Sequence, residues 1–566
     1  MKADAPGRGH GNRGRVRRFA RYAGPVAERD AGPPASRRRA ALITVTAAAM
    51  AVALAAGCTA ARSQQGPVQG HNAEPAGHQA APDAAAVGRL GWHACGSGLR
   101  GLQCASVQVP LNHQQAQGRK ITLALSRVPA TAPSSQYQGV MLVNPGGPGG
   151  SGLSLANDVA SSLDKSVASR YDIIGFDPRG VGSSVPALHC DPSFFSGVRP
   201  DYVPATAAAE QALEARARTY ATECEQRFGW LLPYMTSADT ARDMDSIRSA
   251  LGQPQITYLG DSYGTYLGEV YGTLFPSRVR RMVLDSTVDP AGVWYQDNID
   301  QDYAFQARMQ AFFGWIAANN GSYGLGATPA AVQQVWYRVR AYLGQHPITG
   351  QNGPAVGPDE LDDTFLQGGY DNELWPGLAS ALAQYAHAPA ASRNQAASGL
   401  VSQYQLYGTQ NENQFAVYNA VQCSDVNWPR NWAKWDSDTR TVDRTAPFQA
   451  WDNAWFNAAC AFWPVQGPAS PAQIKGQGLP GVLMLQATGD AATPYAGAQV
   501  AHRLLPTARM VVVEGGGNHV QSLQQPPNTC VNGYLNNYLS TGSLPQNPGP
   551  VNATCPAPLA PSPAAG

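Results

Sequence analysis

Charged side chains are scarce in this chain of 566 residues, because Asp, Glu, Lys and Arg make up only 14% of it, against about 25% in an average soluble protein. The net charge of +1 depends on a basic leader: residues 1–39 hold eleven Lys or Arg and three acidic residues, which leaves 29 basic and 36 acidic residues in the rest. A mildly acidic body offers no basic surface to a phosphate backbone, so nucleic acid is not an expected partner.

Other absences narrow the function further. No two of the nine cysteines form a C-x-x-C pair, which argues against a zinc site or a thioredoxin-like redox site. After residue 58 no apolar run is long enough to cross a bilayer, and no internal repeat is visible. What is present is a globular composition with 43% hydrophobic residues. Because single cores rarely grow beyond about 250–300 residues, we expect a core with a large insertion.

The N-terminus predicts export. Arg37–Arg39 precede the uncharged stretch Ala40–Ala56, which is followed by Gly57 and Cys58; a basic start, an apolar run and small residues are typical of a signal peptide. A cysteine directly after Ala-Gly resembles a bacterial lipoprotein signal, which implies a lipid on Cys58. Simple secretion and a retained anchor helix are the alternatives, since 17 mostly apolar residues nearly suffice to span a bilayer.

The eight cysteines after Cys58 predict four disulfides in an oxidising compartment. Eight cysteines allow 105 pairings, and we expect neighbours in sequence to pair: Cys95–Cys104, Cys190–Cys224, Cys423–Cys460 and Cys530–Cys555. We therefore expect a secreted or envelope-bound monomer that contacts a membrane only through its lipid.

The composition changes along the chain and predicts its organisation. The segments are a signal peptide over 1–58, a flexible tether over 59–86, a first core part over 87–289, a helical insertion over 290–475, a second core part over 476–545, and a Pro-rich tail over 546–566 that is disordered beyond Cys555. The insertion is rich in Tyr, Trp, Gln and Asn.

Within the two core parts, short apolar runs alternate with helical spacing. The predicted strands are Ile121–Arg127, Gly139–Asn144, Tyr171–Asp177, Ile256–Leu259, Val279–Asp285, Val482–Ala487 and Arg509–Val513. Strands separated by helices argue for an α/β fold with a mostly parallel sheet that is covered on both faces.

The pattern with the most specific chemistry is Gly260-Asp-Ser262-Tyr-Gly264, a G-x-S-x-G between a strand and a helix. Such a turn carries the serine on a strained corner, where larger flanking side chains would clash. It exposes the hydroxyl and directs the N–H of Tyr263 at a reacting carbonyl. Ser262 is therefore the predicted nucleophile.

A second Gly-rich turn, Asn144-Pro-Gly-Gly147-Pro-Gly-Gly-Ser-Gly152, follows an earlier strand and can supply the other donor of an oxyanion hole. The same segment matches the dinucleotide-binding pattern G-x-G-x-x-G, with Asp177 as the acid after the next strand. The two prolines stiffen a turn that should wrap a pyrophosphate, and a nucleotide site leaves Ser262 without a role.

Serine needs a base, and the base needs an orienting carboxylate, which follow the serine in the order acid, then histidine. Asp490 and His519 both lie in turns just after predicted strands, at the edge where Ser262 is expected. The competing acid is Asp285, at the end of another strand. This chemistry requires no metal and no organic cofactor.

Together these segments resemble the tripeptidyl-aminopeptidase and prolyl-aminopeptidase group of α/β-hydrolases, particularly exported actinobacterial members. The resemblance rests on Asn144–Gly152, Asp177–Ser183, Gly260–Gly264, Gly489-Asp490 with Thr493-Pro494, and Asn518-His519. It implies the triad Ser262, Asp490 and His519, oxyanion donors from the Gly147 and Tyr263 backbones, and a helical cap inserted after the sixth strand. Related aminopeptidases often carry His where this chain has Pro145, so the resemblance implies only a backbone role for that loop. Arg179 is expected to form a structural ion pair and not to take part in catalysis.

The substrate follows less directly from the sequence. An aminopeptidase needs an acidic group for the substrate's ammonium, and Asp371, Glu373 and Asp425 of the insertion are candidates, with surface solvation as their alternative role. Three functions fit: a peptidase that releases short N-terminal peptides, a carboxylesterase or lipase acting on esters, and a silent binding protein. The last would lack a triad member, and none is missing.

Overall fold

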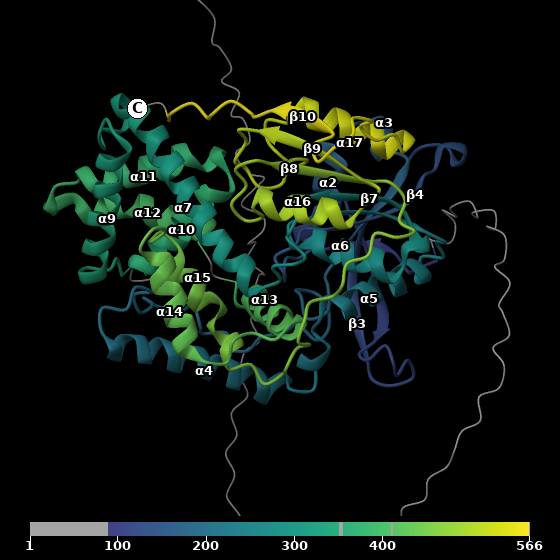
Figure 1. Ribbon diagram of the computed structural model, residues 1–566, viewed down its shortest axis with the longest axis horizontal. Helices are drawn as coiled ribbons and strands as arrows, with labels where there is room; N and C mark the ends of the chain where they lie inside the picture. Colours follow the sequence, from purple (N-terminus) through teal and green to yellow (C-terminus); the bar gives the residue numbers. More distant parts are fainter. Residues whose placement is uncertain (1–88, 350–354, 409–410, 565–566) are drawn as a thin grey trace, which may run out of the picture. The chain divides into compact units, whose positions relative to one another are not determined.

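The computed structural model describes residues 89–349, 355–408 and 411–564. The predicted signal peptide, Cys58 and the whole of the predicted tether lie outside the described residues. The part that is described forms one ten-stranded sheet with helices on both faces and a large helical insertion (Figure 1). None of its helices combines the length and apolar character that a membrane crossing needs.

The sheet is mostly parallel, as expected. Its order is β1-β2-β3-β5-β4-β6-β7-β8-β9-β10, and the neighbours from β5 to β10 are all parallel, whereas β1, β2, β3 and β5 pair antiparallel. The strands are β1 His93–Ala94, β2 Gln103–Pro110, β3 Lys120–Val128, β4 Gly139–Asn144, β5 Tyr171–Phe176, β6 Ile256–Asp261, β7 Val279–Asp285, β8 Val482–Ala487, β9 Ala508–Glu514 and β10 Ala553–Pro556.

Central strands are mostly apolar because both of their faces are buried. In β4, Val140 and Leu142 belong to one core cluster, while Met141 and Val143 belong to the cluster on the other face. This is the alternation that a strand imposes on successive side chains. Helices α5 (Ser237–Ala250), α6 (Tyr263–Leu274) and α16 (Tyr495–Leu504) contribute to the first cluster, and α2 (Leu155–Ser162), α3 (Lys165–Ala168) and α17 (Thr529–Thr541) to the second.

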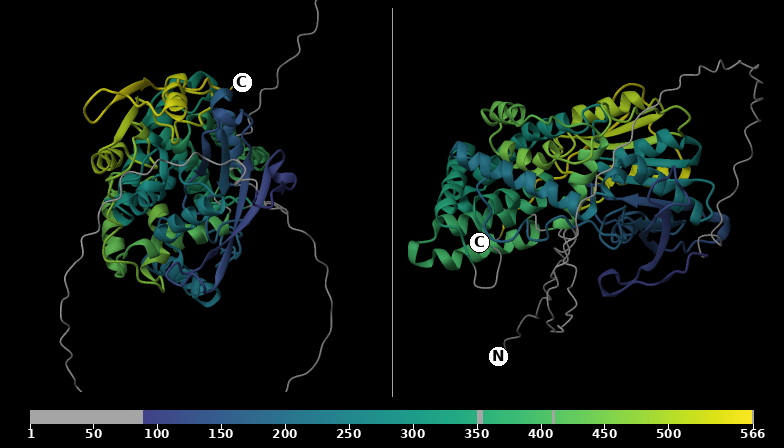
Figure 2. Two further views of the ribbon diagram at one scale, coloured as in Figure 1. Left: turned by 90° about the vertical axis from the view of Figure 1, so that its right-hand side faces the viewer. Right: turned by 90° about the horizontal axis from the view of Figure 1, so that it is seen from below.

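The described residues between β7 and β8 form helices and one isolated bridge, Ile348 with Val356, but no strand. The α-helices are α7 Tyr295–Ala318, α8 Asn320–Tyr323, α9 Pro329–Gln345, α10 Pro358–Tyr370, α11 Trp375–His387, α12 Arg393–Tyr407, α13 Glu412–Asp425, α14 Trp432–Asp443 and α15 Ala450–Asn457, and three short 3₁₀ helices are Asn372–Leu374, Ala390–Ser392 and Ala458–Ala461. Much of this cap has an apolar core of its own, and it lies beside the strands in the right-hand view of Figure 2. If the two-residue β1 is left out, β7 is the sixth strand, which is the expected insertion point.

The cap also recruits a helix from outside the insertion. Helix α4 (Ala207–Phe228) lies between β5 and β6 in the chain, yet its Leu213 and Ala217 pack with Trp451 and Trp455 of α15. The Thr206 hydroxyl accepts a hydrogen bond from the N–H of Ala209 and so begins this helix, as Thr does at many helix N-termini. The sequence did not lead us to expect this contact.

The four disulfides join the cysteine pairs that were expected, at sequence separations of 9, 34, 37 and 25 residues. Disulfides are typical of proteins of oxidising, extracytoplasmic compartments. Near the C-terminus, β10 adds a parallel edge strand beside β9. Beyond Cys555, where the composition predicted disorder, the described residues contact the cap: the Trp315 indole N–H donates to the carbonyl of Pro561, and the Ala564 N–H donates to the Tyr323 hydroxyl.

Candidate active site

Ser262 stands at a corner between β6 and α6 in a conformation that non-glycine residues rarely adopt, with φ 57° and ψ −127°. The flanking glycines are required by close contacts, since a Cβ on Gly260 would lie 2.3 Å from the Gly264 carbonyl oxygen and one on Gly264 2.7 Å from the Asn144 carbonyl oxygen. Strain of about 1–3 kcal/mol is characteristic of functional corners of this type. Residues 260–264 therefore form the strained strand-to-helix turn that the G-x-S-x-G pattern predicts.

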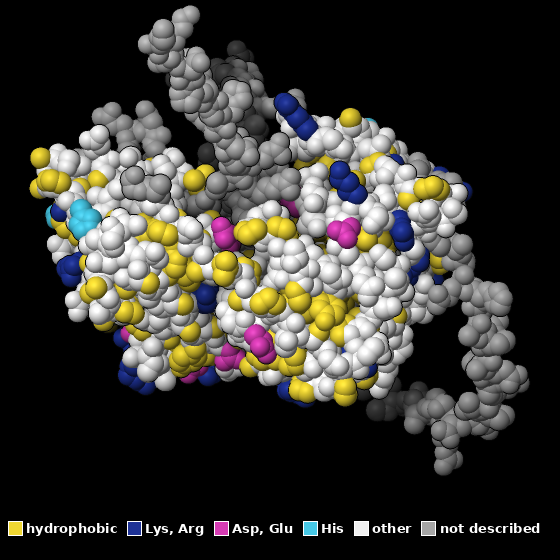
Figure 3. Space-filling view, turned by 90° about the horizontal axis from the view of Figure 1, so that it is seen from above, with side chains coloured by type: hydrophobic (Ala, Val, Ile, Leu, Met, Phe, Trp, Pro, Cys, Tyr) yellow, Lys and Arg dark blue, Asp and Glu magenta, His cyan; other side chains and the backbone are white. Residues whose placement is uncertain are grey.

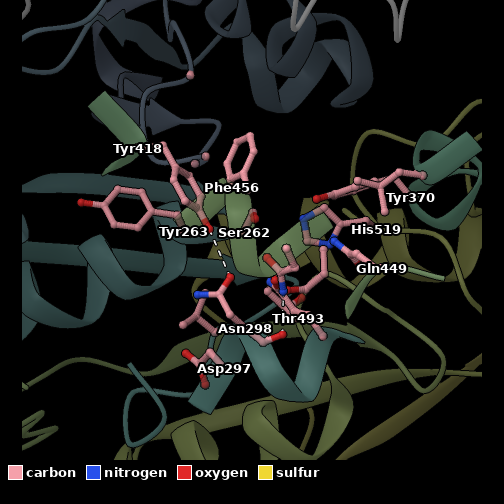
Figure 4. A pocket seen from close by; sticks show the side chains of 18 of the residues that line it. Ser262, Tyr263, Asp297, Asn298, Tyr370, Tyr418, Gln449, Phe456, Thr493 and His519 are labelled. Atoms are coloured by element: carbon pink, nitrogen blue, oxygen red, sulfur yellow. Dashed lines mark hydrogen bonds between the residues drawn. The ribbon is translucent and has the colours of Figure 1, made fainter. Parts of the chain in front are cut away.

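His519 and Asp490 meet in the described structure. His519 Nδ1 lies 2.9 Å from Asp490 Oδ2 and 3.0 Å from Oδ1. Because a carboxylate only accepts, the hydrogen must be on Nδ1, which leaves Nε2 as the basic nitrogen. Nε2 is buried and has no hydrogen-bond partner among the described residues, and Figure 4 shows the imidazole and Ser262 facing the same cavity.

Asp490 is held firmly in place. Its Oδ1 accepts the N–H groups of Ala492 and Thr493, each at 3.0 Å, and its Oδ2 accepts the Thr493 hydroxyl at 3.1 Å. The competing acid, Asp285, receives no hydrogen bond from the imidazole; its carboxylate accepts the N–H groups of Gln521 and Ser522 instead. The geometry favours Asp490 as the partner of His519.

The Gly-rich turn after β4 packs directly against the nucleophile turn. A Cβ on Gly146 would lie 2.8 Å from the Tyr263 nitrogen and 2.9 Å from the Ser262 Cβ, so only glycine fits there. Gly147 has φ +109°, and neither its N–H nor that of Tyr263 donates to another backbone group of the described residues. Both residues line the cavity at Ser262, which leaves two N–H donors available to an oxyanion.

The structure does not support a dinucleotide site, because Asp177, the acid that would bind the ribose, is engaged in hydrogen bonds within the protein. Asp177 accepts the Ser151 hydroxyl at 2.6 Å and the Ser183 N–H at 2.7 Å, and burial raises its pKa to about 6. Arg179 makes two 2.8 Å bonds to the buried Asp243, as expected of a structural ion pair. Both residues fasten the loop after β5.

The cap contacts the base as well as covering the cavity. The carbonyl of Tyr370, at the end of α10, accepts the N–H of His519 at 2.8 Å, and the two rings meet edge to face with centroids 5.5 Å apart. The side-chain oxygen of Asn518, the residue before His519, accepts the N–H of Asn372 at 3.0 Å. The conformation of the histidine loop therefore depends on the inserted helices.

A cavity of about 630 Å³ lies between core and cap and contains the Ser262 and His519 side chains, within the range of about 300–1,000 Å³ that is usual for small-ligand sites. Its cap wall includes Tyr418 and Asn298, joined by the hydrogen bond drawn in Figure 4, and Phe456. The outer face shown in Figure 3 carries only a few charged side chains, and these are scattered.

The charge of the cavity wall is one-sided. Among the described residues that line it there is no lysine or arginine, but there are six aspartates: Asp289, Asp297, Asp300, Asp363, Asp371 and Asp452. No group of three or more His, Cys, Asp or Glu side chains in the described ranges is placed to hold a metal ion. The wall is therefore suited to a ligand with positive charge.

Two of the acidic residues predicted to hold an ammonium are not in this wall. Asp425 accepts the Ser237 N–H at 2.7 Å and hydroxyl at 2.5 Å and the Trp294 indole at 3.3 Å, so its carboxylate caps α5 and is not available to substrate; burial raises its pKa to about 7. Glu373 is exposed on the 3₁₀ helix η6 (Asn372–Leu374) and does not line the cavity. Asp371 does line it.

Sequence reasoning missed three contributors to the site. Gly146 stands one residue from the predicted Gly147, and its role follows only from the close approach of two turns. Tyr370 contacts His519 across 149 residues of sequence, which no local pattern reveals. Asp297 lies in the first turn of α7, immediately after the core, where a switch from apolar to acidic residues was the one available signal.

Known proteins with similar sequences are α/β hydrolases and serine hydrolases. Residues 139–524 match the α/β hydrolase fold family. The chain is 40% identical over 510 residues to a tripeptidyl aminopeptidase of Streptomyces lividans, covering 88% of this chain and 93% of the relative. It is 30% identical over 481 residues to the serine protease Hip1 of Mycobacterium tuberculosis (80% and 87%), and 32% over 503 residues to carboxylesterase B of the same species (85% and 93%). The chain belongs to the α/β hydrolase family, in the group of serine hydrolases that includes the actinobacterial tripeptidyl aminopeptidases.

Proposed function

We propose that this protein is an exported serine aminopeptidase that releases short peptides from free N-termini through an acyl-enzyme on Ser262. The observation that carries the proposal is the cavity around Ser262 and His519, whose described wall has six aspartates and no lysine or arginine. Such a wall attracts an ammonium group and repels a carboxylate or an anionic lipid. The names of the relatives at 40% and 30% identity support the same class of substrate.

The acyl transfer follows from the groups around Ser262. His519 Nε2 takes the Ser262 proton as Oγ attacks the scissile carbonyl, and Asp490 keeps the imidazole in the required tautomer and stabilises its charge. The N–H groups of Gly147 and Tyr263 stabilise the oxyanion. The imidazolium then protonates the leaving amine, and a water that is activated in the same way releases the peptide. The serine–histidine hydrogen bond forms with substrate, as catalytic contacts often do.

Asp297 is our candidate for the ammonium anchor. One of its carboxylate oxygens is buried and accepts no hydrogen bond from the part of the chain that the structure describes, and none of the described lysines or arginines forms an ion pair with it. Burial and the nearby carboxylates of Asp289 and Asp300 raise its pKa well above the usual range. A substrate ammonium would reverse this effect by stabilising the ionised form.

The other acids of the wall already have donors or cations. Asp363 is paired with Arg199 at 2.6 Å, and Asp289 accepts the Ala291 N–H at 2.8 Å. Asp371 accepts the Glu373 N–H at 3.0 Å, and Arg199 partly offsets the charge of Asp452. Asp300 is exposed and accepts from Gln296. Asp297 is the one whose charged neighbours are all acidic.

A side-chain amide in the same wall favours a peptide over a lipid ester. Gln449 lines the cavity, and its buried side-chain oxygen accepts no hydrogen bond from the described residues. A peptide N–H can donate to this oxygen, whereas an acyl chain would leave it unsatisfied at a cost of about 1–3 kcal/mol.

Export and lipidation complete the proposal. Four disulfides and the lipoprotein-like sequence ending in Cys58 support a mature protein held by a lipid at the outer face of the cytoplasmic membrane. Release of lipid-modified protein by detergent, with the Cys58→Ser variant recovered in the medium, would support the anchor. Recovery of both proteins in the medium would contradict it.

The substrate class is tested with a matched panel: a tripeptide amide with a free N-terminus, the same peptide N-acetylated, and a short acyl ester. We expect kcat/KM to be highest for the free amine and every activity to vanish in Ser262→Ala. Turnover of the ester alone would favour the carboxylesterase, the function named for one relative.

The anchor is tested with Asp297→Asn. Loss of a hydrogen bond to a charged group costs about 1.5–3 kcal/mol, so kcat/KM for the free-amine peptide should fall roughly 10- to 150-fold while the ester is spared. Asp300→Asn is the matched control, with a smaller effect because water screens its exposed carboxylate. Equal losses on peptide and ester would contradict the assignment.

A further inference from the structure

The backbone that follows His519 is fastened to the end of β7 by side chains. The Val520 N–H donates to the Ser286 hydroxyl at 2.8 Å, the Gln521 N–H to Asp285 Oδ1 at 2.7 Å, and the Ser522 N–H to Asp285 Oδ2 at 2.7 Å. Three consecutive N–H groups are thus held by two consecutive side chains. Asp285 and Ser286 are completely buried, so water does not compete for these bonds.

We call these three hydrogen bonds, from residues 520–522 to Asp285 and Ser286, the strap. It joins two positions with a strained backbone. Ser286 has φ 60° and Val520 has φ 61°, and a left-handed conformation is rare for any residue other than glycine and a clear outlier for a β-branched one such as valine. Strain of about 1–3 kcal/mol at each position persists only where the surroundings enforce it. Val520 is hydrogen-bonded to Ser286 and follows His519 in the chain. The enforced backbone conformation of Val520 therefore fixes the position of the His519 backbone, from which the imidazole extends.

Two titratable groups lie near the Asp285 carboxylate, Asp261 on the neighbouring strand β6 and His519 in the loop after β9. Asp261, its register partner on β6, is fully buried, and neither of its carboxylate oxygens accepts a hydrogen bond from a described residue. Burial and the charge of Asp285 raise the pKa of Asp261 well above its usual range. Asp285 has two N–H donors and the nearby His519 to offset its own burial. Burial raises the pKa of Asp285 too, but its carboxylate accepts two N–H groups, so a negative charge on the pair is better stabilised on Asp285 than on Asp261.

We propose that Asp285, assisted by Ser286, is a positioning residue that fixes the loop of the catalytic histidine in a strained conformation, so that His519 Nε2 is directed at Ser262. This inference rests on the proposed function insofar as it takes His519 as the base. It gives the acid that competed with Asp490 for the triad a separate role: Asp490 orients the ring through Nδ1, and Asp285 orients the backbone that carries the ring.

The test compares Asp285→Asn with Asp172→Asn. Asp172 is a matched control because it is also buried and accepts a backbone N–H, that of Ala130 at 3.1 Å, and the Tyr137 hydroxyl at 2.8 Å, but it lies at the start of β5, on the sheet edge opposite Ser262. A misplacement of 1 Å can cost about 100-fold in rate. We expect Asp285→Asn to lower kcat about 10- to 100-fold with KM changed less than about threefold, and Asp172→Asn to leave kcat unchanged at a similar loss of thermal stability.

Ser286→Ala removes one bond of the strap and provides a milder variant if Asp285→Asn folds poorly. We expect it to lower kcat by about three- to tenfold, again with little effect on KM. Peptide affinity measured in the Ser262→Ala background should not change when either substitution is added. An unchanged kcat, a loss that appears in KM, or a kcat loss no greater than that of Asp172→Asn would overturn the proposal.

Two further results separate this inference from its alternatives. If Asp285→Asn abolished turnover while Asp490→Asn retained it, Asp285 would be the triad acid and the positioning role would be wrong. If the protein hydrolysed only esters, the peptidase proposal would fail, but the same kcat comparison on the ester would still decide the role of Asp285.

Discussion

Gly146 offers the sharpest test of how the two turns form the site. An alanine Cβ there would lie 2.5 Å from the Asp261 carbonyl oxygen, 2.8 Å from the Tyr263 nitrogen and 2.9 Å from the Ser262 Cβ. All three atoms belong to the nucleophile turn, and none can swing away as the end of a flexible side chain would. Gly146→Ala must therefore move one turn relative to the other.

The cost can be estimated from two contributions. Overpacking of this kind typically costs about 1–3 kcal/mol, and a φ of +87° adds about 1–2 kcal/mol for a residue with a Cβ. We expect Gly146→Ala to lower the free energy of unfolding by about 2–5 kcal/mol. If the shift removes the Tyr263 N–H from the oxyanion, kcat should also fall about 100- to 1,000-fold.

The assay combines chemical unfolding with kcat and KM per folded molecule, on the tripeptide amide and on the ester. Gly314→Ala is the control, because its added Cβ would meet nothing within 4 Å on α7, and alanine in a helix interior is about 0.5–1 kcal/mol more favourable than glycine. A Gly146→Ala protein with kcat within about threefold of wild type would refute the argument that this contact sets the oxyanion hole.

Three further predictions concern the acid, a buried carboxyl and a disulfide. Asp490→Asn would offer an amide N–H₂ to His519 Nδ1 and favour the wrong tautomer, so steady-state kinetics should show kcat lower by about 10³–10⁴; a loss below tenfold would contradict the triad. Glu269 is fully buried, neither of its carboxylate oxygens has a hydrogen-bond partner within the described ranges, and burial raises its pKa well above the usual range. The folded state then keeps a proton that the unfolded chain releases near pH 4.3, so stability should fall as pH rises above that value, and the advantage of Glu269→Gln in unfolding midpoint should grow between pH 4 and 7; a constant difference would contradict this. Replacing the Cys423–Cys460 pair by serines opens a bridge of sequence separation 37 and should cost about 4 kcal/mol by loop-closure entropy; an unchanged midpoint in chemical unfolding would contradict it.

Much of the core could be predicted because its signals are local. The runs Gly139–Asn144, Val279–Asp285 and Val482–Ala487 are mostly apolar and coincide with β4, β7 and β8, since strands buried on both faces have few polar positions. Ser262, Asp490 and His519 follow strands, and the ends of parallel strands share one sheet edge. Their convergence could therefore be inferred without knowing the strand order.

The parts that could not be predicted depend on distant contacts. Edge strand β10 is four residues long and takes its order from β9 and a disulfide. Asp425 was a poor choice of anchor because its position near Cys423 said nothing about where the end of α13 directs a carboxylate; the structure directs it at the N-terminus of α5. The charge of the cavity wall, too, emerges only when segments from 289 to 452 come together.

The central claim is that Ser262 is the nucleophile of an aminopeptidase, and covalent labelling tests it most directly. A tripeptidyl phosphonate ester with a free N-terminus would be reacted with the protein beside its N-acetylated counterpart, and the adduct located by peptide mass mapping. We expect one adduct, on Ser262, formed at least about tenfold faster with the free amine, in keeping with a charged hydrogen bond of about 1.5–3 kcal/mol. An adduct on another residue, or equal rates for the two reagents, would contradict the account.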